Sequence, residues 1–212
     1  MDPLKVKAGP VDVLMLPGCR IAARTERGEA FEPESLAAWA EMVIPGQAAF
    51  DIGAYTGLYA VAAAKLGGAA YAFEPMPDQC ARLKDNADLN GAKIALRRCA
   101  VSDVNGAEEF RFNGSVPLTS GGSLAGRGSH VTMVITRRLD DLDLPPVAAI
   151  KIDVERAEDR VLRGAVRIVA EWRPQIIAEV LESAAVERLA ALLPGYRLKR
   201  LLDGRNAWLA PA

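Results

Sequence analysis

The chain has 212 residues, of which 26 are basic and 27 are acidic, so its formal net charge is −1. This length favours a single domain, and a charge so close to zero argues against a dedicated nucleic-acid binder, which normally carries a basic face. The longest uncharged and mainly apolar run, residues 52–64, has 13 residues and is too short for a membrane-spanning helix.

Residues 1–46 are expected to form an N-terminal extension with little regular structure. One short helix is predicted over residues 36–42, because Ser35 is a suitable cap and the pair Pro45-Gly46 ends a helix. Residues 47–212 are predicted to form one domain, since no linker and no internal repeat interrupts them.

The sequence also bears on the compartment in which the protein works. The only apolar stretch near the N-terminus, residues 11–16, is interrupted by Asp12, so no secretory signal is expected. Cys19, Cys80 and Cys99 are odd in number and show no Cys-x-x-Cys spacing. They are therefore interpreted as reduced, buried thiols of a cytoplasmic protein, and neither as disulfides nor as zinc ligands.

Residues 47–212 alternate between short apolar runs and stretches with helical spacing. The predicted strands cover residues 48–52, 69–73, 93–101, 108–112, 131–136, 147–152, 175–180, 196–202 and 206–209. The predicted helices cover residues 58–66, 77–90, 161–169 and 186–193. This order predicts an α/β fold in which a mostly parallel sheet carries helices on both faces and ends in an antiparallel hairpin.

Residues 113–129 are rich in Gly and Ser and show no hydrophobic pattern. A loop of this length is long for a compact domain, and such loops are usually either lids over a site or disordered. Of these two alternatives we carry forward a substrate lid. In sheets of this kind ligands bind beyond the carboxyl ends of the strands, so the informative residues should follow strands.

The segment Asp51-Ile52-Gly53-Ala54-Tyr55-Thr56-Gly57 joins the first of these strands to its helix. Its two glycines permit a tight turn and a close approach of a ligand, and the helix that follows offers backbone N–H groups to an anion. Glu74 follows the next strand, 23 residues after Asp51, where an acidic residue can accept hydrogen bonds from both hydroxyls of a ribose. The sequence therefore predicts a nucleoside site.

A nicotinamide dinucleotide is one candidate ligand, but its fingerprint needs glycine where this chain has Tyr55 and Leu58. S-Adenosylmethionine, which carries a ribose without phosphates, fits better. We expect Asp51 to face its amino group, the loop amides to face its carboxylate, and Glu74 to face its ribose. The remaining predicted cofactor contacts are Pro75 and the adenine walls Met76, Cys99 and Ala100.

Four blocks of the sequence together resemble the FkbM-type family of S-adenosylmethionine-dependent methyltransferases. They lie within residues 50–57, 72–91, 100–106 and 151–165, and the most specific is Lys151-Ile152-Asp153-Val154-Glu155. The resemblance covers about residues 48–181. It implies the Rossmann-like methyltransferase fold, with a seven-stranded sheet, and O-methylation of a hydroxyl on a sugar, glycan or natural product. Arg156 stands where the family usually has glycine.

Methyl transfer to a hydroxyl needs alignment of the acceptor oxygen and a base that removes its proton. Asp153 ends a predicted strand, so we expect it to act as the base or to orient the acceptor, with Glu155 beside it. Lys151 points the same way by the period of a strand and would hold the Asp153 carboxylate. The only histidine, His130, is a further candidate base because imidazole titrates near neutral pH.

No metal is expected, because Asp153, Glu155 and Glu158 are close in sequence without forming a His/carboxylate set with ligand spacing. The segment Asp143-Leu-Pro-Pro-Val147 precedes a strand and lacks the aromatic residue of amino-directed nucleic-acid methyltransferases. We therefore expect a small-molecule or glycan acceptor, no nucleic acid and no membrane insertion. Two alternatives remain: a protein that binds S-adenosylmethionine or a nucleotide without transferring a methyl group, and a nicotinamide-dependent reductase.

Overall fold

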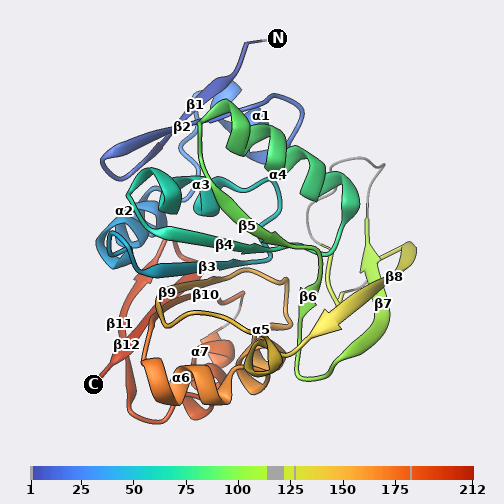
Figure 1. Ribbon diagram of the computed structural model, residues 1–212, viewed down its shortest axis with the longest axis vertical. Coiled ribbons are helices and arrows are strands. Elements are labelled where there is room, and N and C mark those ends of the chain that lie inside the picture. The colour runs from blue at the N-terminus through green and yellow to red at the C-terminus, as the bar shows by residue number, and fades with distance from the viewer. Residues whose placement is uncertain (1, 114–121, 127, 182) are drawn as a thin grey trace.

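The computed structural model of the protein describes residues 2–113, 122–126, 128–181 and 183–212 (Figure 1). Its central sheet has seven strands, namely β3 (Ala48–Ile52), β4 (Ala69–Phe73), β5 (Ile94–Arg97), β9 (Val147–Ile152), β10 (Gln175–Glu179), β11 (Tyr196–Leu202) and β12 (Asn206–Pro211). Their order is β11-β12-β10-β9-β3-β4-β5. The strands from β10 to β5 are parallel, and β12 is antiparallel to both of its neighbours. The predicted parallel sheet with a closing hairpin is therefore confirmed.

Helices cover both faces of this sheet, as Figure 1 shows. One face carries α2 (Pro33–Met42), α3 (Leu58–Lys65) and α4 (Pro77–Leu89), and the other carries α5 (Glu158–Arg163), α6 (Val166–Trp172) and α7 (Ser183–Ala191). In β3, Phe50 and Ile52 belong to the core on the α5–α6 side, whereas Ala49 belongs to the core on the α2–α3 side. A strand that packs on both faces favours apolar residues at nearly every position, which is why β3 is apolar except at Asp51.

The N-terminal extension is more regular than the sequence predicted. It contains a hairpin of β1 (Leu4–Ala8) and β2 (Val11–Met15), followed by α1 (Arg20–Glu26) and α2. The sequence signal for the hairpin is an alternation of apolar and charged residues. In β1 the buried Val6 lies between the exposed Lys5 and Lys7, and in β2 the buried Val13 follows the partly exposed Asp12. The hairpin packs on α2 and α3, so the extension completes the core on that face of the sheet.

Helix α2 begins earlier than predicted and is capped by a residue from the other end of the chain. Ser35 lies inside its first turn, where its buried Oγ accepts a hydrogen bond of 3.0 Å from Asn206. The cap comes from Asp203, in the turn between β11 and β12. Its carboxylate oxygens accept hydrogen bonds from the backbone N–H groups of Glu34 and Ser35, at 3.1 and 2.8 Å. A cap from so distant a residue leaves no local pattern in the sequence.

A second, smaller sheet consists of β6 (Ala100–Val101), β8 (His130–Arg137) and β7 (Gly106–Phe112) in that order. The single strand predicted over residues 93–101 is therefore two strands, because the chain leaves the main sheet after β5 and pairs with β8. The strands predicted at 108–112 and 131–136 are present but belong to this smaller sheet. Residues 114–121 and 127 of the predicted lid loop lie outside the described residues.

The helix predicted over residues 161–169 is divided into α5 and α6 at Gly164. A Cβ at Gly164 would lie 2.0 Å from the carbonyl oxygen of Ser102, so the chain approaches the segment after β6 too closely for any side chain. A new helix then begins because Asp140, in the short helix η1 (Leu139–Asp141), accepts hydrogen bonds from the N–H groups of Arg167 and Ile168.

The three cysteines are free and buried, as predicted. Burial raises the pKa of the Cys80 thiol to about 12 and that of Cys99 to about 11, so neither is poised as a nucleophile. None of the helices within the described residues is both long enough and apolar enough to cross a bilayer.

Replacing Asp203 should weaken the N-terminus of α2. In Asp203→Ala two N–H groups lose their acceptor, so we expect the free energy of unfolding to fall by about 1 kcal/mol in denaturant titrations. Asp12→Ala is the control, because it removes only exposed ion pairs with Lys5 and Lys7 and should cost less than about 0.5 kcal/mol. Equal losses in the two variants would contradict the capping role.

Candidate active site

A pocket of about 1120 Å³, open to solvent, lies at the carboxyl ends of β3, β4 and β9. The helices that follow β3 and β9 cover opposite faces of the sheet (Figure 1), so the strand order reverses between these two neighbours. Open α/β sheets bind their ligands at this reversal. Other segments complete the walls, with Ile21 and Phe31 from the N-terminal extension, Phe110 from β7, and Arg205 from the turn before β12.

The loop after β3 is shaped by a close contact between two backbones. Gly53 has a φ of 79°, and a Cβ there would lie 1.9 Å from the carbonyl oxygen of Asp153. Asp51 is buried at the end of β3 and accepts a hydrogen bond of 2.9 Å from the N–H of Ala60, which ties the strand to α3. Burial raises the pKa of Asp51 to about 7, although the charge of Lys151 opposes this rise.

The backbone amides of this loop are mostly engaged inside the protein. The N–H groups of Gly53 and Ala54 both donate to the carbonyl oxygen of Phe73, at 3.0 and 3.1 Å. The N–H of Gly57 donates to the carbonyl of Ala54 at 2.8 Å, and the N–H of Tyr55 donates to a carboxylate. Four of the five amides from Gly53 to Gly57 are thus occupied inside the protein, so the expectation that they face the carboxylate of a ligand stays a prediction that this bonding does not favour.

Glu74, directly after β4, is the carboxylate that Tyr55 holds. Its Oε2 accepts the N–H of Tyr55 and its Oε1 accepts the N–H of Met76, both at 2.9 Å. Burial raises the pKa of Glu74 to about 7, and these two hydrogen bonds oppose the rise. Each carboxylate oxygen keeps a further lone pair, so the fixed side chain can still accept hydrogen bonds from two hydroxyls of a ligand.

The other side of the pocket contains a fully buried ammonium group. Lys151, in β9, donates to Oδ2 of Asp153 at 3.1 Å and to Oδ1 of Asn206 at 3.4 Å. Its Nζ also lies 5.1 Å from the centre of the Tyr59 ring. Burial lowers the pKa of Lys151, but Asp153 and other carboxylates more than offset this and raise it above its ordinary value. Lys151 therefore stays charged and holds Asp153, as the strand period predicted.

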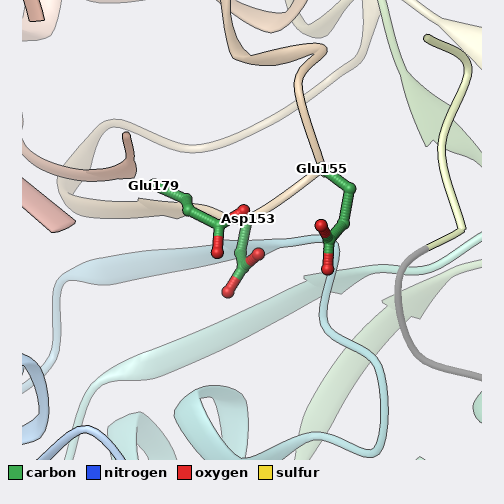
Figure 2. A group of neighbouring side chains, drawn as sticks. All are labelled: Asp153, Glu155 and Glu179. Carbon is green, nitrogen blue, oxygen red and sulfur yellow. The ribbon is translucent and has the colours of Figure 1, made fainter. Parts of the chain in front are cut away.

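Asp153 belongs to a group of three carboxylates, shown in Figure 2. One oxygen each of Asp153, Glu155 and Glu179 lies within 4.8 Å of the other two. Glu179, at the end of β10, is ion-paired with Arg205, whereas Glu155 makes no hydrogen bond or ion pair with another residue in the described ranges. Burial and the charge of Asp153 raise the pKa of Glu155, and they raise that of Glu179 to about 7.

By its geometry this group of carboxylates could hold a divalent cation. Two of its members already face cations of the protein, since Lys151 neutralises Asp153 and Arg205 neutralises Glu179. Sequence spacing missed the group because Glu179 arrives from the neighbouring strand. The expectation that the chain holds no metal stays a prediction.

Most of the residues predicted for the site do meet in the pocket. Its lining includes Asp51, Gly53, Ala54, Tyr55, Glu74, Pro75, Met76, Ala100, Asp153 and Glu155. Thr56, Gly57 and Cys99 are not part of that lining, and the carbonyl of Thr56 instead accepts a hydrogen bond from Asn86. His130 is exposed at the start of β8, where it stacks on Phe112 with 5.4 Å between ring centres. His130 is not part of the pocket lining, and its role as a base stays a prediction.

Several residues of the pocket carry no local signal in the sequence. They include Arg20, Ile21, Phe31, Glu32, Tyr59, Gln79, Phe110, Leu124 and Arg205, most of which come from segments outside the motifs. Glu32 connects two of the others, since its Oε2 accepts a hydrogen bond of 2.7 Å from the hydroxyl of Tyr59 and its Oε1 lies 4.0 Å from Arg205. Only the folded chain brings these segments to the strand ends.

Comparisons with known proteins identify relatives of this chain. The family model described as "Methyltransferase FkbM domain" matches residues 51–198. The curated protein 31-O-demethyl-FK506 methyltransferase FkbM from Streptomyces tacrolimicus is 28% identical over 231 residues, which covers 88% of this chain and 88% of that protein.

Solved structures share the fold at lower identity. Methyltransferase FkbM from Methylobacillus flagellatus KT is 16% identical with a TM-score of 0.56, over 84% of this chain and 51% of that one. The T. thermophilus 16S rRNA N2 G1207 methyltransferase, solved with AdoMet and guanosine, is 12% identical with a TM-score of 0.62, over 99% of this chain and 50% of that one. The chain thus spans about half the length of these two structures, and the predicted Rossmann-like methyltransferase fold is confirmed.

The raised pKa values predict how stability depends on pH. Asp51, Glu74 and Glu179 have pKa values of about 7 in the folded protein, so between roughly pH 4.5 and 7 the folded state binds more protons than the unfolded state. Stability should therefore increase as pH falls through this window. We expect a larger free energy of unfolding at about pH 6 than at about pH 8, and a flatter dependence in Glu74→Gln. A stability that increases toward pH 8 would contradict these assignments.

Proposed function

Because the chain belongs to the family of FkbM methyltransferase domains, we propose that it transfers a methyl group from S-adenosylmethionine to a hydroxyl oxygen of a small-molecule or glycan acceptor. The observation that carries this proposal is the charge of the pocket. Within the described parts of the chain, its lining includes the carboxylates Glu32, Asp51, Glu74, Asp153 and Glu155, but only three cations, Arg20, Lys151 and Arg205. Such a lining attracts a cofactor with sulfonium and ammonium groups and repels one with a diphosphate.

The residues present fit this cofactor. Glu74 is fixed by two amides and can accept both ribose hydroxyls, and Asp51 has one carboxylate oxygen engaged with α3 and a second available to an amino group. Met76 and Ala100 follow β4 and β5 at the positions expected for the adenine. When bound, S-adenosylmethionine supplies a methyl group on a positively charged sulfur.

We propose different roles for the two carboxylates on the acceptor side of the pocket, Asp153 and Glu155. Asp153 is held by the ammonium group of Lys151, which fixes its position, so it suits the orientation of the acceptor hydroxyl. Glu155 lines the same pocket, makes no such bond within the described residues, and has a raised pKa. We therefore assign removal of the hydroxyl proton to Glu155.

The acceptor is proposed to be a small molecule or a glycan. Beside the carboxylates, the lining offers apolar side chains such as Ile21 and Phe31, and the carboxylates would repel a polyanionic nucleic acid. The relative from S. tacrolimicus is named as a methyltransferase of 31-O-demethyl-FK506, a small molecule. Because the T. thermophilus structure with the same fold is an rRNA methyltransferase, RNA belongs among the acceptors to be tested.

The proposal is tested by two measurements on the full chain. Calorimetry with S-adenosylhomocysteine and NADH identifies the cofactor, and transfer of an isotopically labelled methyl group to hydroxylated sugars, macrolides and RNA identifies the acceptor. Transfer to a hydroxyl supports the proposal. Binding of S-adenosylhomocysteine without transfer to any acceptor would point to a binding protein, and binding of NADH alone would point to a reductase.

Glu74 should dominate recognition of the ribose. We expect Glu74→Ala to weaken binding of S-adenosylhomocysteine by roughly 1.5–3 kcal/mol, which is the usual loss for hydrogen bonds to a charged group. Glu74→Gln should lose less, because it keeps an acceptor for one of the two amides. Glu41→Ala, on the exposed side of α2, serves as a control that leaves affinity unchanged. An unchanged affinity in Glu74→Ala would exclude the ribose assignment.

Glu155 and Asp153 should differ in kinetics and in stability. We expect Glu155→Gln to lower kcat by about 100-fold or more, with affinity for S-adenosylhomocysteine unchanged, because only the proton acceptor is lost. Asp153→Asn should lower turnover and also stability, because it leaves the buried ammonium of Lys151 without its nearest counter-charge. If Glu155→Gln keeps its turnover while Asp153→Asn loses it at equal stability, the two roles are reversed.

A further inference from the structure

We propose that Arg20 binds the α-carboxylate of S-adenosylmethionine, so that the N-terminal extension supplies a cofactor-binding residue. This inference rests on the proposed function. The α-carboxylate is the one anionic group of the cofactor's amino-acid end, and without Arg20 it would lie among the carboxylates of the pocket. Without a cation or several N–H donors nearby, that group would be repelled by the lining of the pocket.

The loop after β3 is the usual source of such donors, and here it supplies few. The N–H groups of Gly53 and Ala54 are both bonded to the carbonyl of Phe73, and that of Tyr55 is bonded to Glu74. Using them for a ligand would break hydrogen bonds that hold the loop together and would leave buried acceptors unpaired. These occupied amides favour a partner for the carboxylate on another segment.

Among the residues that the structure describes, three cationic side chains line the pocket, and two of them already have carboxylate partners. Lys151 is bonded to Asp153, and Arg205 is ion-paired with Glu179. The guanidinium group of Arg20 makes no hydrogen bond and no ion pair with any residue in the parts of the chain that the structure describes. Arg20 is thus the lining cation whose charge remains available, and a guanidinium can bind a carboxylate through two parallel N–H···O bonds.

The placement of Arg20 agrees with this role. Arg20 is the first residue of α1, and its backbone N–H donates to the hydroxyl of Tyr55 at 3.3 Å, so α1 is attached to the cofactor loop itself. The charge of Arg20 lowers the pKa of both Tyr55 and Glu155, although burial raises both more strongly, so the guanidinium is within electrostatic reach of each. It therefore lies at the junction of the cofactor loop and the acceptor side.

The test compares the binding affinities of two ligands that differ only in the α-carboxylate. Calorimetry on the full chain compares S-adenosylhomocysteine with S-adenosyl-3-thiopropylamine, which keeps the amino group and lacks the carboxylate. The variants are Arg20→Met, Arg20→Lys and the control Arg27→Met, which removes an exposed arginine at the other end of α1 that is ion-paired with Glu29. Thermal unfolding of each variant reports any loss of folding.

We expect Arg20→Met to weaken S-adenosylhomocysteine by about 10- to 100-fold and to leave the amine analogue unchanged within about twofold. Arg20→Lys should recover part of the loss, and Arg27→Met should bind both ligands like the wild type. Equal weakening of both ligands would indicate a merely structural role and overturn the inference, as would unchanged binding of S-adenosylhomocysteine. If the wild type binds neither ligand, the proposed function fails and the inference fails with it.

Discussion

The buried ammonium group of Lys151 constrains the acceptor side of this protein more than any other single charge. A charge removed from water is tolerated only where partners surround it, and removing one partner of a buried pair typically costs about 3–5 kcal/mol. Here the partners are Asp153 at the end of its own strand, Asn206 on β12, and the ring of Tyr59 on α3. Strand β9, the C-terminal hairpin and helix α3 are therefore held in one arrangement around the ammonium group of Lys151.

The second constraint joins the two halves of the pocket. Gly53 approaches the carbonyl of Asp153 so closely that a Cβ would lie 1.9 Å away, so the backbone of the cofactor loop is in direct contact with the backbone at the end of β9. Asp51 and Glu74, both with pKa values raised by burial, lie on the cofactor-loop side of this contact, and Glu155 lies on the β9 side. The contact explains how a methyl donor and a proton acceptor can be brought to the same place without a long loop between them.

The sequence predicted those parts of the structure that depend on local pattern. Apolar parallel strands are recognisable because they are buried on both faces, and Asp51, Glu74 and Asp153 are predicted because they stand at the carboxyl ends of such strands. Arg20 and Arg205 were missed because only packing over the whole chain brings them to the pocket. For His130 the chemistry suits a base, but its position at the start of β8 is set by pairing in a sheet that the sequence did not reveal, and it does not line the pocket.

The turn after β9 gives a reason beyond charge to look for chemistry at Glu155. Glu155 and Arg156 have φ values of 53° and 79°, a left-handed conformation that costs an L-residue roughly 1–2 kcal/mol. This conformation accounts for the glycine that the family usually has at position 156. The turn is fixed because the N–H of Arg156 donates to Glu158 at 3.2 Å. Such conformations cluster at functional sites, and one of these two strained residues, Glu155, carries a carboxylate that makes no hydrogen bond or ion pair within the described residues and lies close to Asp153 (Figure 2).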